Sequence, residues 1–175
     1  MGSTILWGKL PAHGDFVARG LSASGRDRLD DWLAASLADA RGVFGDGFDD
    51  AYDQAPPWRF AWPDPPHWTA GAMAPSVDAV GRRYPILLAR TAVSPAEVEP
   101  VAEAVEELLY TALVARWGAD TLTAAASAIA VTQATPWTSG PRWWTLGAEG
   151  FGEQAVAGEH PPALMRNMLM QEDGS

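Results

Sequence analysis

The sequence predicts a single α+β domain over residues 1–175, with a largely antiparallel sheet of about five strands covered by helices. Two long segments repeat apolar residues at spacings of three and four, which is the helical period. Several short segments are continuously apolar or alternate apolar with polar residues, as strands do. No repeat or low-complexity linker divides the 175 residues, and this length suits one domain.

The first elements are a strand and a long helix. Residues 4–10 are short and apolar, and Pro11 ends the predicted strand. His13-Gly14-Asp15 is typical of a turn. Residues 22–41 are predicted to form a helix that ends at Gly42, because their apolar residues share one face. Those apolar residues are Leu29, Trp32, Leu33, Leu37 and Ala40.

The middle of the chain is predicted to form a loop followed by three strands. Residues 42–57 are rich in Gly, Asp and Pro, which indicates a loop with at most a short turn near 48–52. Aromatic residues alternate over 58–62, and 69–74 is expected to return as the second strand of a hairpin. After a connection, the continuous apolar run over 84–92 predicts a buried central strand.

A second long helix begins near Ser94. Ser94-Pro95-Ala96-Glu97 has the capping-box pattern, and the helix is expected to end at Gly118. Pro100 either kinks this helix or marks its true start, because proline lacks the N–H that an inner turn needs. The remaining predicted elements are a helix capped by Asp120 and reaching residue 130, a strand over 142–146 and a helix over 161–170.

Composition excludes several classes of function. The chain carries 22 acidic and 12 basic residues, for a net charge of −10, which argues against nucleic acid or an anionic membrane as the main partner. The chain has no cysteine, which excludes disulfides, thiolate nucleophiles and cysteine zinc sites. No apolar run is long enough to span a bilayer, and the N-terminus lacks signal-peptide features. We therefore expect a cytoplasmic protein without direct membrane insertion.

Motifs for catalysis and cofactor binding are weak. His13, His67 and His160 lie in no HExxH or HxH pattern, so no metal or other cofactor is predicted. The chain has no GxSxG elbow and no phosphate-binding glycine loop. A hydrolase stays open as an alternative only if His13 and Asp15 face Ser76 or Asp78 at about 3 Å.

Acidic and aromatic residues leave two interpretations open. Asp46, Asp49, Asp50 and Asp53 cluster in the predicted loop without the spacing of an EF-hand. They form either a solvated acidic loop or a surface for a protein partner. The nine tryptophans are interpreted mainly as core residues, although tryptophan is also common at interfaces.

Three segments set charged residues among Gly, Pro and aromatic residues: 8–16, 57–60 and 75–85. Glycine permits unusual backbone angles and close approach, so a charged side chain between such fixed points is directed. It either forms a structural ion pair, such as Asp15 or Asp78 with Arg82, or is presented to a partner. The residues alone leave both interpretations open.

In their order and spacing, these segments resemble the N-terminal domain of the TagF (ImpM) family, which is associated with type VI secretion. The resemblance covers nearly the whole chain. Its motifs are Gly8-Lys9-Leu10-Pro11, Gly14-Asp15-Phe16, Arg19-Gly20-Leu21, Leu29-Asp30-Asp31-Trp32-Leu33, Trp58-Arg59-Phe60, Gly71, Pro75-Ser76-Val77-Asp78, Val80-Gly81-Arg82, Tyr84-Pro85 and Trp143-Trp144-Thr145.

The resemblance implies a post-translational repressor of type VI secretion that binds a forkhead-associated (Fha) scaffold protein. Some members of the family carry a PP2C-type phosphatase domain, for which 175 residues leave no room, so no enzymatic activity is expected. A structural or accessory part of the secretion apparatus is the alternative.

We expect the first loop and residues 78–83 to bind the partner, with added apolar area from Trp58 or Trp62. Reversing the charges of Arg82 and Arg83 should then abolish binding while the fold survives. The candidate partner-binding residues are Lys9, Asp15, Phe16, Arg19, Trp58, Asp78, Arg82 and Arg83.

Overall fold

A single antiparallel sheet organises the part of the chain that the computed structural model describes, residues 2–171. Its seven strands lie in the order β2-β1-β5-β4-β3-β6-β7. The α+β prediction is therefore confirmed. The strands are β1 (Thr4–Gly8), β2 (Val17–Arg19), β3 (Trp58–Asp64), β4 (His67–Ala74), β5 (Ile86–Val93), β6 (Arg142–Thr145) and β7 (Gln154–Ala157).

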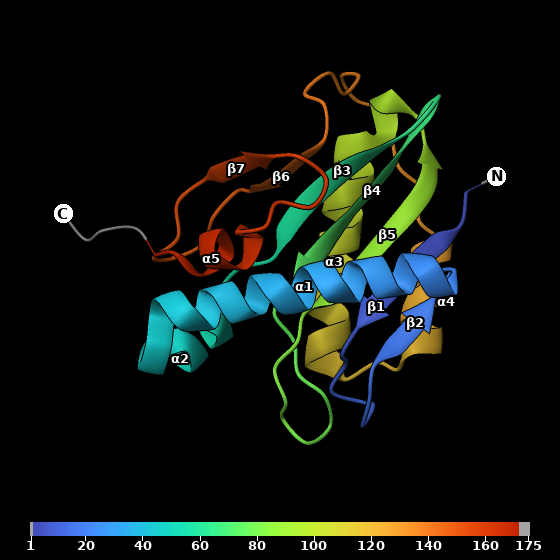
Figure 1. The fold of residues 1–175 in the computed structure, drawn as a ribbon. Coiled ribbons are helices and arrows are strands. Elements are labelled where there is room, and N and C mark those ends of the chain that lie inside the picture. Colours follow the sequence, from blue (N-terminus) through green and yellow to red (C-terminus); the bar gives the residue numbers. More distant parts are fainter. Residues whose placement is uncertain (1, 172–175) are drawn as a thin grey trace.

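Helices cover both faces of this sheet (Figure 1). The long helix α1 (Ala23–Phe44) lies on one face with α2 (Phe48–Gln54) and α5 (Leu164–Leu169), and α3 (Val98–Ala115) and α4 (Ala119–Ser127) lie on the other. A strand between two helical layers is buried on both sides, which explains why the first half of β5, residues 86–89, is a continuous apolar run.

Alternate residues of β5 supply two cores. Ile86 and Leu88 pack with α3 and α4, whereas Leu87 and Ala89 pack with α1 and α5. β5 pairs with β1 on one side and with β4 on the other, where Gly71 lies opposite Ala89. The expected hairpin is also present, since β3 and β4 pair from Trp58–Met73 to Asp64–His67.

The prediction of about five strands missed the two edges of the sheet. β2 has three residues and β7 has four. Both are too short to show a period of their own, and each is a strand only because it pairs with β1 or β6.

The predicted loop over 42–57 is wrong. Gly42 does not end α1; the helix continues to Phe44 and ends at Gly45, whose φ of 54° only glycine adopts easily and whose N–H donates to the carbonyl of Arg41. Residues 48–54 then form α2, with Phe48 and Tyr52 buried. Tertiary burial of these aromatic residues overrides the local Gly and Asp signals.

The start of α3 also corrects a prediction. Residues 95–97 form a 3₁₀ turn, in which Glu97 N–H donates to the carbonyl of Ser94, and the Ser94 hydroxyl has no partner among the described residues. The capping box is therefore absent. α3 begins at Val98, which places Pro100 in its first turn, where a missing N–H costs little. α4 likewise begins at Ala119, without a side-chain cap from Asp120.

An aromatic cluster joins α1, β3 and β6 and contacts one histidine, His160, which keeps one side exposed. The His160 ring lies 4.7 Å from the Trp32 ring and 5.1 Å from the Trp62 ring, between centroids. Burial lowers the pKa of His160 below its usual value; Glu159 opposes this shift and Arg28 adds to it. The neutral ring is therefore favoured in the folded state.

We expect this histidine to make the domain less stable in mild acid. Its contribution to the free energy of unfolding is fully present above about pH 6.5, the ordinary histidine pKa, and decreases as the pH falls through that value. Urea unfolding at pH 7.5 and 5.5 should show a smaller loss for His160→Phe, which keeps the ring without its charge. Equal losses in the variant and the native protein would contradict this assignment.

Candidate partner-binding site

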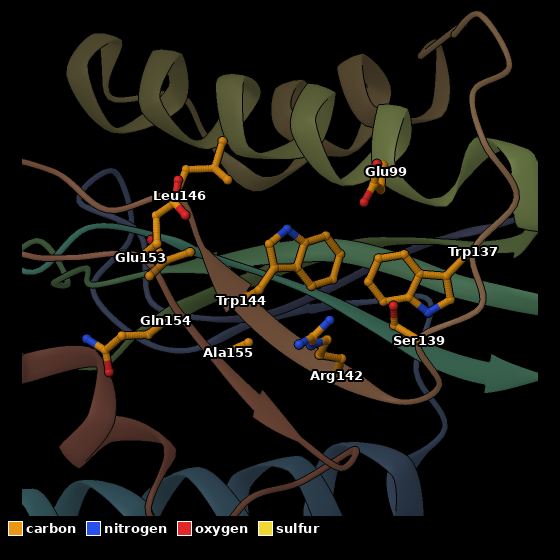
Figure 2. A pocket seen from close by; sticks show the side chains of 10 residues that line it. Glu99, Trp137, Ser139, Arg142, Trp144, Leu146, Glu153, Gln154 and Ala155 are labelled. Carbon is orange, nitrogen blue, oxygen red and sulfur yellow. The ribbon is translucent and has the colours of Figure 1, made fainter.

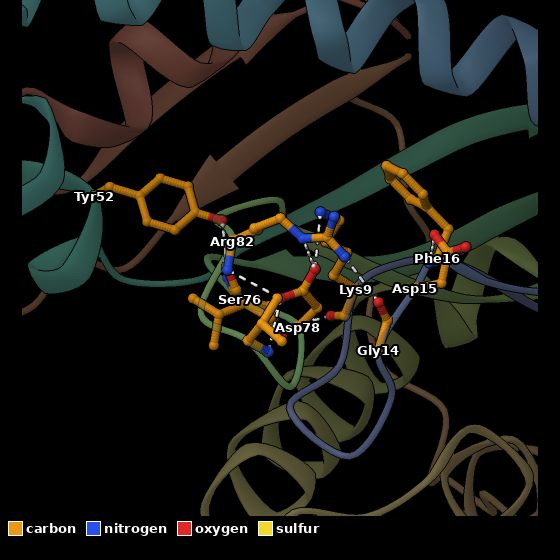
Figure 3. Close-up of polar contacts among 10 residues, drawn as sticks. Lys9, Gly14, Asp15, Phe16, Tyr52, Ser76, Asp78 and Arg82 are labelled. Carbon is orange, nitrogen blue, oxygen red and sulfur yellow. Dashed lines mark hydrogen bonds and ion pairs between the residues drawn. The ribbon is translucent and has the colours of Figure 1, made fainter.

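Two connections meet at one end of the sheet (Figure 3). The first connection, residues 9–16, follows β1, and the second connection, residues 75–85, joins β4 to β5. Backbone hydrogen bonds join them: Ala79 N–H donates to the carbonyl of His13 at 2.7 Å, and Lys9 N–H donates to that of Pro85 at 3.3 Å. The fold therefore places two of the three segments singled out in the sequence side by side.

Asp78 is the buried anchor of this junction. Its Oδ2 lies 3.1 Å from Lys9 Nζ and 2.7 Å from Arg82 Nε, while its Oδ1 accepts hydrogen bonds from the backbone N–H groups of Val80 and Arg82. Burial alone would raise the pKa of Asp78, but these donors outweigh it and hold the pKa well below its usual range. The Asp78–Arg82 pair is one of those the sequence suggested.

Four residues around this anchor are exposed, and we call them the two-loop surface: Asp15, Phe16, Val80 and Arg82. Arg82 Nη2 donates to the carbonyl of Gly14 at 2.8 Å, so both connections fix this guanidinium, yet its side chain is 61% exposed. Phe16 is 40% and Val80 is 73% exposed. Figure 3 shows Asp15 and Phe16 on the Gly14 side of Arg82. The result is a mixed apolar and charged surface held in one geometry.

The ring of Phe16 packs against two other aromatic residues. Its ring stacks on Trp7 with centroids 5.1 Å apart and meets the edge of Tyr84 at 4.8 Å. The Tyr84 hydroxyl accepts from Trp7 Nε1 and donates to a carboxylate oxygen of Asp30 on α1. Burial raises the pKa of Tyr84 above its usual range, so the phenol stays neutral and can donate. The two-loop surface is thus tied to the main core.

Arg83 connects the second connection to α2. Its Nε and Nη2 donate to the two carboxylate oxygens of Asp53 at 2.9 and 2.7 Å, and its Nη1 lies 3.4 Å from Asp49. The hydrogen bonds from Arg83 lower the pKa of Asp53. Two members of the acidic cluster therefore have a structural partner and belong to a helix, which neither sequence interpretation anticipated.

A hollow of about 310 Å³ opens beside this junction. Tyr52 forms part of its wall; the phenol donates to the carbonyl of Ser76 at 2.9 Å and accepts from Ser76 N–H. Burial raises the Tyr52 pKa above its usual range. Pro11, Val77 and Leu113 also line the hollow. It is therefore suited to an apolar side chain of a partner.

Comparison with known families matches residues 6–135 to the TagF N-terminal domain, described as type VI secretion system-associated. That span contains both connections. The chain belongs to the TagF N-terminal domain family. None of the curated proteins compared with the sequence matches it.

The fold of this TagF domain is shared with a solved structure. The crystal structure of PA0076 from Pseudomonas aeruginosa PAO1 superposes with a TM-score of 0.75 at 21% sequence identity, over 99% of this chain and 96% of that one. At this identity the likeness concerns the fold.

The TagF domain divides the candidate residues between its surface and its interior. Asp15, Phe16 and Arg82 lie on the two-loop surface, whereas Lys9 and Asp78 are buried beneath it. Trp58 is only 1% exposed and packs in the core, so of the two tryptophans expected to add apolar contact area Trp58 is excluded; Trp62 is half-buried against the same core. Arg19 pairs with Asp120 of α4 at 3.0 Å, away from Arg82. Arg83 is held by α2.

Val80 was not singled out from the sequence by itself. An apolar residue beside glycine in a charged connection is the signal that could have identified it.

The structure also changes the expectation for reversing Arg82 and Arg83. Both arginines make ion pairs within the TagF domain, so their reversal would disturb the fold as well as the surface. Val80 is the better position for a test.

The residues of the hydrolase alternative point to separate partners. Ser76 Oγ donates to the carbonyl of Lys9 at 2.7 Å, and His13 Nε2 accepts from Ala119 N–H at 3.0 Å. Asp15 Oδ1 accepts from Phe16 N–H. No hydrogen bond joins these side chains to one another in the described part of the TagF domain, and within residues 2–171 no three His, Asp or Glu residues form a metal-binding group. The geometry therefore does not bring His13 and Asp15 to Ser76 as the hydrolase alternative requires.

None of the helices described within residues 2–171 combines the length and apolar character needed to cross a membrane.

Proposed function

We propose that this TagF domain is a non-catalytic cytoplasmic regulator that represses type VI secretion after translation, and that it binds a forkhead-associated scaffold protein through the two-loop surface. The observation that carries this proposal is the exposed Phe16, Val80 and Arg82 held over the buried Asp78 ion pair. The family match supplies the setting, since type VI secretion-associated proteins work among protein partners.

The surface has the properties of a binding site that is formed before the partner arrives. Arginine and aromatic residues are the types that most often dominate binding energy, and Arg82 and Phe16 are of these types. Because Asp78, Gly14 and Trp7 already fix their positions, little conformational entropy is lost on binding. The adjoining hollow beside Tyr52 would take an apolar side chain of the scaffold.

A secretion assay with one matched pair of variants tests the proposal. Val80→Glu puts a charge on the two-loop surface, and Val114→Glu makes the same change on the outer side of α3, where valine is 86% exposed. In a strain lacking its own copy, the wild-type chain and Val114→Glu should lower release of type VI substrates into the medium. Val80→Glu should leave release high.

Equal repression by both variants would remove the two-loop surface from the proposal. Co-purification with sheath or baseplate proteins at a fixed stoichiometry would instead support a structural role in the apparatus.

A further inference from the structure

Among residues 2–171, the sheet leaves one edge and part of one face uncovered. β7 is the last strand in the sheet order, and α3 makes its main contacts with β3, β4 and β5. Beyond α3, a hollow of about 360 Å³ lies against β6 and β7 (Figure 2). In Figure 1 these strands lie at the upper left, whereas the second connection hangs at the bottom. This surface is therefore separate from the two-loop surface.

The backbone of β7 has hydrogen-bonding groups directed outward. Gly158 N–H donates to the carbonyl of Pro141, the residue directly opposite it. In an antiparallel pair, every second residue bonds to the neighbouring strand, and the residues between them direct their backbone groups the other way. Val156 and Gln154 therefore bond to β6, and Ala155 and Ala157 direct their N–H and carbonyl groups away from the sheet. Both alanines are exposed and their side chains are small, so a further strand can approach.

The hollow beside this edge is aromatic and acidic. Trp144 and Trp137 stack with centroids 4.8 Å apart, and Leu146 is exposed at one end. Glu99 and Glu153 line the same hollow, and neither has an ion pair within residues 2–171. The residues that line the hollow carry two negative charges and one positive charge, that of Arg142, and the whole chain has a net charge of −10. The site therefore favours a cationic partner.

We propose that β7 binds an extended segment of a protein partner as an added strand, with basic and aromatic side chains alternating along the segment face that overlies the hollow. An aromatic side chain opposite Ala155 would fill the hollow against Trp144, and basic residues on either side of it would reach Glu153 and Glu99. A second copy of the chain is disfavoured, because antiparallel pairing of two β7 strands with Ala155 opposite Ala157 would bring Glu153 opposite Glu159 of the copy.

This proposal does not rest on the two-loop surface or on the secretion role. A fluorescein-labelled Ser-Lys-Thr-Phe-Thr-Lys-Ser peptide is the probe, and Ser-Glu-Thr-Phe-Thr-Glu-Ser is its charge-reversed control. Fluorescence anisotropy should show saturable binding of the first peptide and none of the second. Ala155→Pro removes one outward N–H from an edge strand and should weaken binding by about tenfold or more, whereas Ala155→Ser keeps the N–H and should bind as the native protein does.

Two further measurements keep the test decisive if Ala155→Pro fails to fold. In the unaltered protein, the peptide should slow amide hydrogen exchange at Ala155 and Ala157 and leave Val156 unchanged. Combined Glu99→Gln and Glu153→Gln should weaken binding by about threefold to tenfold at low salt. Absence of saturable binding, protection confined to other strands, or equal affinity for the two peptides would overturn the proposal.

Discussion

Asp78→Asn is expected to release the two connections from each other and to lower the stability of the whole domain. The substitution removes the charge that holds Lys9 and Arg82 but keeps the size of the side chain. Lys9 is buried and would be left without an anion, and an unpaired buried charge costs about 3–5 kcal/mol. Urea unfolding should show a loss of this order, and Asp15→Asn, on the exposed side of the junction, should stay within about 0.5 kcal/mol of the native protein.

The rate of chemical labelling at Lys9 reports directly whether Asp78→Asn exposes this lysine. Lys9 is the only lysine in the chain, so an amine-specific reagent reports its exposure without interference from other lysines. It should label Lys9 slowly in the native protein and rapidly in Asp78→Asn. Slow labelling in a folded Asp78→Asn variant would contradict the assignment of Asp78 as the anchor.

The free energy of unfolding lost in Asp78→Asn depends on pH in a defined direction. The pKa of Asp78 is lowered in the folded state, so its contribution is fully present above about pH 3.9, the ordinary aspartate value, and is lost as the pH falls below it. The difference in stability between the native protein and Asp78→Asn should therefore stay constant from pH 7 to 5 and narrow below about pH 4.

Gly71→Ala is expected to prevent β4 and β5 from pairing. A Cβ at Gly71 would lie 2.0 Å from the carbonyl oxygen of Leu88 and 2.7 Å from the Cα of Ala89. Both are backbone atoms of the central strand, so no side chain can turn aside and the strands must separate. The cost should exceed the roughly 1–3 kcal/mol of ordinary overpacking.

Gly42→Ala is the matched control for this change. Gly42 lies within α1, with open space where its Cβ would be, so alanine should raise the free energy of unfolding by about 0.5–1 kcal/mol. Circular dichroism and urea unfolding of the two variants test both expectations. A folded Gly71→Ala protein of native stability would contradict the described register of β4 and β5.

How much of this fold the sequence could predict depends on where each element gains its stability. The central strands and α1 and α3 carry their own apolar periods, so they were predicted with boundary errors of a few residues. β2 and β7 are strands because of their neighbours, and α2 forms because Phe48 and Tyr52 are buried by distant residues. Local patterns do not contain that information.

The site divides in the same way. Glycine, proline and charge in residues 8–16 and 75–85 indicated directed side chains, and the Asp78–Arg82 pair lies within a single segment. Lys9 is 69 positions from Asp78, and Asp53 is 30 positions from Arg83, so neither contact could be read from spacing. Exposure also depends on the fold. Trp58 is buried and Val80 is exposed because β3 lies inside the sheet, whereas the second connection lies at its end.

The binding partner and the two-loop surface can be tested together by isothermal titration of the purified chain with the purified forkhead-associated scaffold protein of its own secretion system. We expect saturable binding by the native protein and by Val114→Glu, and a loss of at least about tenfold in affinity for Val80→Glu, since a charge would be buried in the interface. Binding that is unchanged by Val80→Glu, or no binding by the native protein, would contradict the proposal.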